Sequence, residues 1–298
     1  MRTEPQVSSP PTFLQCGSYR LTFAAPLLMG IVNVTPDSFS DGGLHATCEA
    51  AIAHGRALVE EGADMLDIGG ESTRPGAEPV PLAEERRRVL PVIEALAGCG
   101  VPLSVDTRKP QLMGEAIAAG ASLVNDIDAL ESPQALEIVS RSTAAVCLMH
   151  KQGDPQTMQQ NPRYEDVVAE VRDYLAKRLA AAEREGIARE RIVIDPGFGF
   201  GKTYEHNLAL VRALATFTQL GATVLAGLSR KAMLGRITGR EPAARVHASV
   251  AAALFAAERG ARILRVHDVG ATRDALSVWI ALKGTIGVFS PEQGTGPG

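Results

Sequence analysis

The sequence predicts an α/β protein with the (β/α)8 architecture of a TIM barrel, preceded by a short N-terminal hairpin. Eight short apolar and β-branched runs recur along the 298 residues, and amphipathic or alanine-rich segments separate them. Such alternation indicates parallel strands joined by crossover helices, and one barrel of this kind needs about 250 residues. Eight repeats favour a closed barrel over an open, doubly wound sheet, although the count by itself leaves both open.

The expected elements follow one another in a regular order after the hairpin, which we place in residues 13–23 at the lower end of the barrel. No linker interrupts the alternation, so residues 13–288 are expected to form one domain, with residues 1–12 and 289–298 as frayed tails. The predicted strands are residues 27–34, 65–70, 102–107, 123–127, 145–150, 192–197, 224–229 and 263–269. The clearest predicted helices are residues 46–62, 82–98 and 165–186.

Composition and charge argue against several other classes of protein. An apolar content of 45% is ample for one core, and a net charge of -4 with both signs interspersed gives no basic stripe for nucleic acid. No apolar run approaches the roughly 18 residues of a membrane helix, and the N-terminus lacks the apolar segment of a secretory signal. The four cysteines are scattered without metal-binding spacing, as expected for reduced thiols in a cytoplasmic enzyme.

One stretch, IDPGFGFGKT at residues 194–203, is close to a nucleotide-binding loop but fails both common patterns. A P-loop requires Gly at the position of Pro196, and the dinucleotide-binding pattern requires its last Gly at the position of Lys202. We therefore interpret the stretch as a strand end at Asp195, followed by a tight Gly-rich turn that brings Phe200 to the flank of a ligand.

Each predicted strand delivers a polar or ionisable residue at its carboxyl end. In a parallel barrel these ends meet at one mouth, where active sites lie. Any single one of these residues could instead be a helix cap or a turn residue, but eight successive strand ends of this kind favour a binding site. They are Asn33, Asp67, Asp106, Asn125 with Asp126, His150, Asp195, Ser229, and Arg265 with His267.

The loop after the first strand, residues 33–43, is polar and ends in glycine. It contains two carboxylates, Asp37 and Asp41, and one aromatic residue, Phe39, which suits a mobile substrate cover better than a structural loop. Asn33, at the strand end, could ligate a hard cation such as magnesium through its amide oxygen.

Basic residues of two neighbouring loops could bind an anion. Arg265 and His267 are two residues apart and therefore share a face of the last strand. Together with Arg74 they would form a clamp suited to a diphosphate. The plainer alternatives are a surface arginine in a turn for Arg74 and a structural histidine for His267.

Carboxylate and amide groups occupy the other strand ends. Asp106, Asn125 and Asp195 would rise from the barrel floor in a pattern that suits a flat nitrogen heterocycle with donor edges. Lys231, in GLSRK, could hydrogen-bond a carbonyl oxygen of the same ring.

Taken together, these motifs resemble the dihydropteroate synthase family of pterin-binding barrels, which acts in folate biosynthesis. The resemblance runs from residue 27 to residue 269 and rests on NVTPDSFSDGG, DIGGESTRPG, SVDT, NDI, LMHKQGDPQTMQ, DPGFGFGK, GLSRK and RVHDV. It implies a homodimer that uses Mg2+ to join 6-hydroxymethyl-7,8-dihydropterin diphosphate to 4-aminobenzoate, giving 7,8-dihydropteroate and diphosphate.

The resemblance also implies a role for each residue of the mouth. Asp106, Lys231 and Asp41 are predicted to be catalytic, and Asp106 is expected to stabilise a pterin cation formed when diphosphate departs. The pterin should be held by Asp106, Asn125, Asp195 and Lys231, between walls formed by Met149, Phe200 and Gly227. The diphosphate should be held by Asn33, Arg74, Arg265 and His267, with Asn33 acting also through magnesium. The aminobenzoate should be framed by Thr73, Pro75, Phe39 and Ser229.

Two positions depart from the pattern of the family, and three other interpretations remain. Ala232 stands where a serine is common, and Lys151, where a methionine is common, is expected to face solvent. A methyltransferase that uses methyltetrahydrofolate would share the pterin floor but would not need the first loop or the diphosphate clamp. A non-catalytic pterin-binding paralogue would be expected to lack residues of these two features, and an unrelated phosphosugar barrel would explain the fold alone.

Overall fold

The computed structural model describes residues 10–34, 43–71, 78–154 and 156–284. Eight parallel strands close into a barrel in the order β10-β3-β4-β5-β6-β7-β8-β9, and a two-stranded antiparallel hairpin, β1-β2, precedes them. The predicted (β/α)8 barrel and its N-terminal hairpin are therefore confirmed. The strands are β1 (Phe13–Cys16), β2 (Tyr19–Thr22), β3 (Leu27–Asn33), β4 (Met65–Gly69), β5 (Leu103–Asp106), β6 (Leu123–Asp126), β7 (Ala145–Met149), β8 (Ile192–Asp195), β9 (Thr223–Ala226) and β10 (Ile263–Val266).

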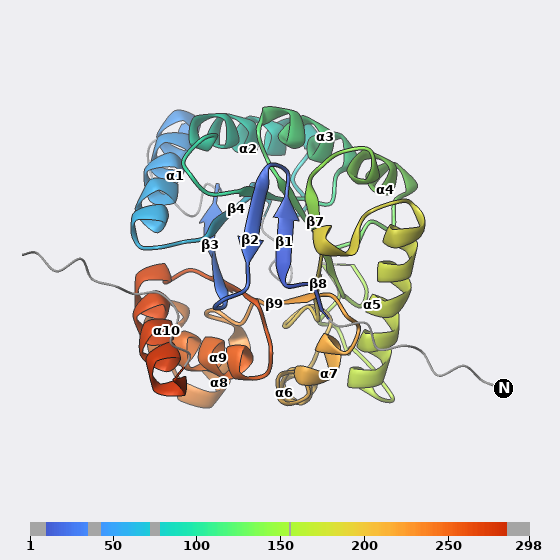
Figure 1. Cartoon of the computed structure of the whole chain (residues 1–298), viewed down its shortest axis with the longest axis vertical. Helices are drawn as coiled ribbons and strands as arrows, with labels where there is room; N and C mark the ends of the chain where they lie inside the picture. The colour runs from blue at the N-terminus through green and yellow to red at the C-terminus, as the bar shows by residue number, and fades with distance from the viewer. Residues whose placement is uncertain (1–9, 35–42, 72–77, 155, 285–298) are drawn as a thin grey trace, which may run out of the picture.

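The helices surround the strands as an outer ring, and the hairpin lies across the front of the barrel in the view of Figure 1. The α-helices are α1 (Gly43–Glu60), α2 (Leu82–Leu96), α3 (Pro110–Ala119), α4 (Pro133–Ser140), α5 (Val167–Arg184), α6 (Tyr204–Arg212), α7 (Ala215–Thr218), α8 (Ala232–Thr238), α9 (Val246–Glu258) and α10 (Val269–Lys283). Two 3-10 turns, η2 (Arg189–Arg191) and η3 (Pro242–Ala244), precede β8 and α9. Within the described ranges, none of these helices combines the length and apolar character needed to cross a membrane.

Local capping explains where several crossover helices begin. The Ser132 side chain accepts a hydrogen bond from the first turn of α4, and Asp166 accepts two from the first turn of α5. At α6, Thr203 and His206 form a reciprocal capping box. Each cap satisfies backbone N–H groups that have no partner within the helix, and so fixes the point at which the chain turns from loop to helix.

Alternation along each strand divides the interior into two cores. Outward-facing strand residues pack under the helices in the larger core, whereas inward-facing residues near the strand starts form a second core inside the barrel. The hairpin closes this inner core, because Leu14 and Cys16 of β1 are fully buried in it and the N–H of Gly17 donates to the carbonyl of Thr143 at 3.0 Å. The hairpin therefore lies at the lower end of the barrel, as predicted, and leaves the carboxyl ends of the strands as the opposite mouth.

Candidate active site

The strand ends bring six charged or amide side chains to the inside of the mouth. Residues two apart share a strand face, so Asp67 follows the inward Met65, and Asn125 and Asp195 follow the inward Leu123 and Val193. Strand register then places these groups side by side: Asp106 pairs with Asn125, and Asp195 pairs with Met149. The inward charged or amide residues at the strand ends are Asn33, Asp67, Asp106, Asn125, Asp195 and Arg265.

Arg265 ties the centre of this group together. Its Nε donates to Asp67 Oδ2 at 2.6 Å, and its Nη2 donates to Asp106 Oδ2 at 2.8 Å. Asn125 Nδ2 donates to the same Asp67 oxygen at 3.0 Å. One guanidinium thus pairs with two carboxylates from β4 and β5, and it supplies the cation beside the fully buried Asp67.

Burial sets the protonation behaviour of these groups. It raises the pKa of the Asp106 carboxyl well above its ordinary range; the neighbouring Asp67 carboxylate adds to the rise, and Arg265 opposes it. Burial also raises the pKa of Asp195. The N–H of Gly197, which donates to Asp195 Oδ1 at 2.7 Å, partly offsets this rise because it stabilises the charged carboxylate. Burial would lower the pKa of Arg265, but the Asp67 and Asp106 carboxylates raise it, so the guanidinium stays charged.

A second group of predicted residues lines the side of the mouth next to β8 and β9. A Cβ atom at Gly227 would lie 3.9 Å from Asp195 Oδ2 and 3.9 Å from Arg265 Cβ, so this glycine leaves space between them. Lys231 Nζ lies 4.3 Å from the centre of the Phe200 ring, a cation–π contact that orients both side chains. Gly227 and Lys231 therefore lie on the Asp195 side of the mouth, with Phe200 in contact with Lys231.

His267 pairs with Ser229 at the end of β10. Ser229 Oγ and His267 Nδ1 are 3.0 Å apart, and the backbone N–H of His267 donates to the same hydroxyl at 3.2 Å. Burial lowers the pKa of His267 to about 3, and the positive charge of Arg265 adds to this effect. The imidazole is therefore neutral near pH 7, so it can serve an anion as a hydrogen-bond donor but adds no charge to the clamp.

Comparison with known proteins identifies the family of the chain. The family description of pterin binding enzymes matches residues 29–267. The chain belongs to the pterin binding enzyme family. It is 51% identical to a dihydropteroate synthase of Neisseria meningitidis serogroup C over 273 residues, which cover 90% of this chain and 96% of that one.

Solved structures of this family are similar over most of their length. Xanthomonas albilineans dihydropteroate synthase with 4-aminobenzoic acid superimposes with a TM-score of 0.87 at 57% identity, covering 92% of this chain and 98% of that one. The same enzyme in complex with 7,8-dihydropteroate gives a TM-score of 0.84 at 54% identity, covering 91% and 99%. The resemblance found in the sequence motifs, to the dihydropteroate synthases, is thereby confirmed.

Five predicted site residues of this pterin binding enzyme lie outside the described residues: Phe39, Asp41, Thr73, Arg74 and Pro75. The predicted diphosphate clamp is therefore described only at Arg265 and His267. Asn33 is described as the last residue of β3, half-buried, on the inward register of the strand and paired with Gly69 of β4.

The Gly-rich turn after β8 owes its shape to backbone contact, as the sequence predicted. Gly197 has a positive φ of 71°, and a Cβ atom there would lie 1.9 Å from the carbonyl oxygen of His150. Gly201 has a φ of 62°, and its Cβ would lie 2.3 Å from the carbonyl oxygen of Gln152. Only glycine fits either position. The threonine of the GKT triplet, Thr203, caps α6 with its hydroxyl rather than facing a ligand.

Two polar strand ends, Asp126 and His150, face away from the mouth, and the interpretation as a turn residue holds for Asp126. Asp126 faces away from the barrel axis and accepts hydrogen bonds from the N–H groups of Asp128 and Leu130, as a turn residue does. His150 is buried behind the mouth and contacts Lys202.

Lys151, which was expected to face solvent, does not point freely into it: its Nζ pairs with Asp128 at 3.1 Å, and only 19% of its side chain is exposed.

Two features of the site were not assigned from the sequence. Asp67 was grouped with the polar strand ends but was given no role; the signal was a carboxylate inside an apolar strand, which requires a buried cation as partner. The second is an ion-pair cluster in which Lys109 bonds both Glu71 and Glu85, the latter almost fully buried on α2. Nothing in the spacing of these three residues indicates that they meet.

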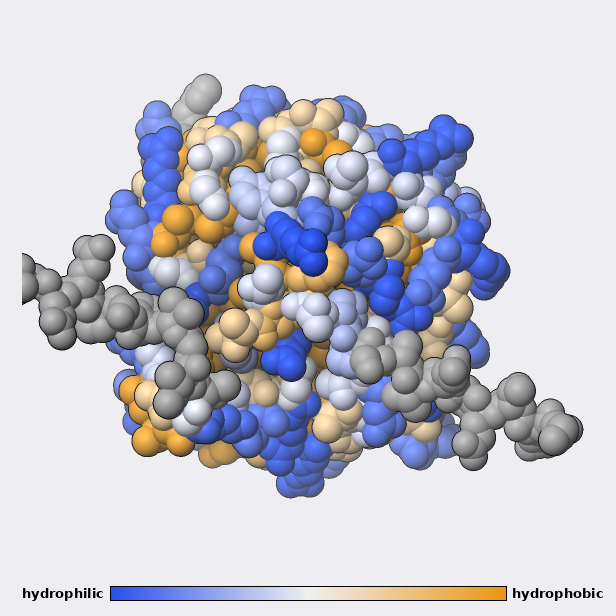
Figure 2. Space-filling view, viewed as in Figure 1, coloured by the Kyte–Doolittle hydropathy of each residue, from blue (hydrophilic) through white to orange (hydrophobic). Residues whose placement is uncertain are grey.

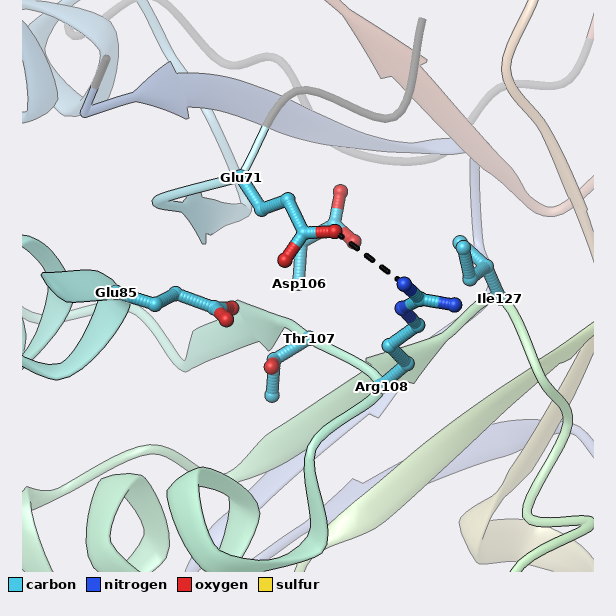
Figure 3. Close-up of a pocket in the computed structure, with 6 residues that line it drawn as sticks. All are labelled: Glu71, Glu85, Asp106, Thr107, Arg108 and Ile127. Atoms are coloured by element: carbon cyan, nitrogen blue, oxygen red, sulfur yellow. Dashed lines mark ion pairs between the residues drawn. The ribbon is translucent and has the colours of Figure 1, made fainter. Parts of the chain in front are cut away.

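The cluster borders a small cavity beside Asp106. Figure 3 shows the side chains around it and the ion pair between Arg108 and Glu71, which are 3.8 Å apart. The cavity measures about 10 Å³, room for about one water molecule. A cavity of this size is too small for a pterin ring.

Proposed function

We propose that the chain is a dihydropteroate synthase. Such an enzyme transfers a dihydropterin-methyl group, through its methylene carbon, from diphosphate to the nitrogen of 4-aminobenzoate, and so is a transferase of an alkyl group other than methyl. The observation that carries this proposal is the convergence of Asp106, Asn125 and Asp195 with Arg265 on the inside of one barrel mouth. This is an acceptor-rich floor for a ring with donor edges, beside a cation for an anionic leaving group. The near-50% identity to known dihydropteroate synthases supports it.

The pterin is assigned to the part of the mouth between β5 and β9. Asp195 and Asn125 would bond the ring edge, and Lys231 would bond its carbonyl oxygen. Phe200, Met149 and Gly227 would enclose the two ring faces. Three features support this assignment: the nearly buried Asp195 (7% exposed), the Lys231–Phe200 contact and the space left by Gly227.

The diphosphate is assigned to the other side of the mouth. Arg265 uses Nε and Nη2 for carboxylates, and we assign its third nitrogen, Nη1, to a phosphate oxygen; the neutral His267 and Arg74 would donate further hydrogen bonds. Among the described residues, no group of three acidic, cysteine or histidine side chains could hold a metal. Asn33, half-buried on the inward register, would hold Mg2+ through its amide oxygen. When bound, the ion would neutralise charge on the departing diphosphate.

The chemistry follows from the charges of the mouth. The bond between the methylene carbon and the diphosphate oxygen breaks first, and its electron pair leaves with the diphosphate. Asp106 then stabilises the delocalised pterin cation by its negative charge, while Asp41 and the loops framing the aminobenzoate (Phe39, Thr73, Pro75, with Ser229) exclude water. The arylamine nitrogen, which is neutral at pH 7, attacks the methylene carbon and releases a proton to solvent.

Product formation tests this function directly. We expect 7,8-dihydropteroate, followed by mass spectrometry, when the purified chain is mixed with the pterin diphosphate, 4-aminobenzoate and Mg2+, and loss of product when EDTA replaces the ion. Retained pterin binding without product would contradict the synthase and favour a non-catalytic or methyl-transferring protein. Absence of both pterin binding and product would contradict the assignment of the mouth.

We also propose that the chain forms a homodimer through the face made by α8, α9 and α10. Four large apolar side chains are exposed on these helices: Ile237, Phe255, Val278 and Leu282, the last with 83% of its surface accessible. Hydrophobic side chains are visible at the lower left of Figure 2, where Figure 1 places α8 and α10. Exposed apolar residues clustered on one face are typical of protein–protein contacts.

The mass of the particle in solution tests the dimer. We expect light scattering after gel filtration to give twice the chain mass for the unchanged protein, and Val278→Asp to shift the particle toward the monomer, because a carboxylate would be desolvated at the interface. Lys177→Asp, on the exposed side of α5, is the matched control and should leave the mass unchanged. A monomeric unchanged protein would contradict the proposal.

A further inference from the structure

Lys202 is a buried lysine with three acceptors. Only 3% of it is exposed. Its Nζ lies 2.9 Å from the carbonyl oxygen of Phe200, 3.2 Å from the carbonyl oxygen of His150 and 3.0 Å from His150 Nδ1. An ammonium group has three N–H donors, so each of these contacts takes one. The lysine that gave the GKT triplet its likeness to a phosphate-binding loop is therefore fully used inside the protein.

These contacts join two strand ends that carry the proposed pterin-binding residues. The acceptors of Lys202 belong to the residue that follows β7 and to the Gly-rich turn that follows β8. The backbone N–H of His150 also donates to the carbonyl of Asp195 at 3.0 Å, and Gly197 packs directly on the His150 carbonyl. Lys202 is thus hydrogen-bonded to both of the segments that lie next to Asp195 and Phe200.

We propose that Lys202, through His150, is a positioning residue for the pterin half of the site: it holds the Phe200 wall and the Asp195 carboxylate where a pterin ring can bind. This inference rests on the proposed function. It predicts an asymmetric effect, because Lys202 contacts the turn after β8 and the end of β7, whereas the residues assigned to the diphosphate, Asn33, Arg265 and His267, are on β3 and at the end of β10.

Replacing the lysine by a residue of similar length without donors tests the inference. We expect Lys202→Met to weaken binding of 6-hydroxymethylpterin about tenfold or more in calorimetry, since the turn loses three hydrogen bonds and the Phe200 carbonyl loses its buried partner. Binding of inorganic pyrophosphate with Mg2+ should stay within about twofold. In steady-state assays, KM for the pterin diphosphate should rise more than kcat falls. The matched control is Lys177→Met on the exposed side of α5, which should change neither ligand.

The outcomes separate the inference from the function on which it rests. Failure of the unchanged protein to bind 6-hydroxymethylpterin would contradict the proposed function itself. Normal pterin binding by a folded Lys202→Met variant, or an equal loss of pterin and pyrophosphate, would overturn the positioning role. If Lys202→Met cannot be purified, His150→Leu decides in the same way: it removes the Nδ1 acceptor and leaves the two carbonyls, so we expect about a threefold selective loss of pterin binding.

Discussion

Arg265→Met is expected to destabilise the fold by about 3–5 kcal/mol, the usual effect of removing one partner from a buried ion pair. The guanidinium is the cation shared by Asp67 and Asp106, and Asp67 is fully buried. Without Arg265, two carboxylates from neighbouring strands would face one another in a site of low dielectric. Urea unfolding at pH 7 would give the free energy of unfolding for both proteins.

The pH dependence of this loss has a definite sign. Burial and Asp67 already raise the pKa of the Asp106 carboxyl, and Arg265 opposes this rise. Without Arg265 the folded variant would therefore bind more protons than the unfolded chain. Its stability should then fall as the pH rises from about 4 to 8, and the deficit relative to the unchanged protein should be larger at pH 8 than at pH 5. Arg141→Met, which removes an exposed ion pair with Glu137, should change stability by less than about 1 kcal/mol. An Arg265→Met loss no larger than that of the control would contradict the central role of this ion pair.

Asp106→Asn is expected to lower kcat on the order of 100–1000-fold, the range seen when one preorganised electrostatic contact to a transition state is removed. The amide keeps the size of the side chain but cannot stabilise a pterin cation by charge. The fold should tolerate the change, because burial and the adjacent Asp67 already disfavour the charged form of Asp106. Thermal unfolding and single-turnover kinetics would measure the two effects separately.

The same residue should control the acid limb of activity. As the pH is lowered, protonation of Asp106 should reduce kcat. Because the pKa of Asp106 is raised, this fall should occur at a higher pH than an ordinary aspartate would give. The kcat of Asp106→Asn should not show this fall. Asp126→Asn is a matched control: it alters a more deeply buried carboxyl on the next strand, which caps a turn on the far side of the sheet. We expect it to cost stability but to leave kcat within about threefold. A comparable loss of kcat in both variants would show that burial, rather than position at the mouth, explains the effect.

The strand ends show how far the site can be predicted from the sequence. Polar residues at the ends of apolar runs identified Asp106, Asn125 and Asp195 as members of one mouth, and the structure places all three there. The same criterion also selected Asp126 and His150, which lie outside the mouth. The two groups differ in strand parity, that is, in whether a residue falls on the inward-facing or the outward-facing positions of its strand, because adjacent residues face opposite sides of a sheet. Parity requires the register of each strand, and an apolar run of four or five residues with both faces buried does not reveal it.

The sequence also could not predict which side chains form ion pairs and hydrogen bonds with one another, for a related reason. Arg265 was expected to hold an anionic ligand, but two of its nitrogens bond Asp67 and Asp106, which lie 198 and 159 residues earlier in the chain. Lys202 likewise finds its acceptor 52 residues away in His150. Such pairs form because the closed barrel turns the ends of β4, β5 and β10 toward one mouth and places β8 beside β7.

The sequence by itself determined the number of strands, their parallel order, the hairpin and the motifs that define the family, since these depend on local periodicity, turn chemistry and short contiguous patterns. The tertiary structure decided which polar residues face the barrel axis and which charges neutralise one another. It also decided which acceptors the lysine of the GKT triplet meets, namely the carbonyl of Phe200 and two atoms of His150. The physical reason is that burial and charge pairing depend on contacts between distant segments, and closure of the barrel is what creates those contacts.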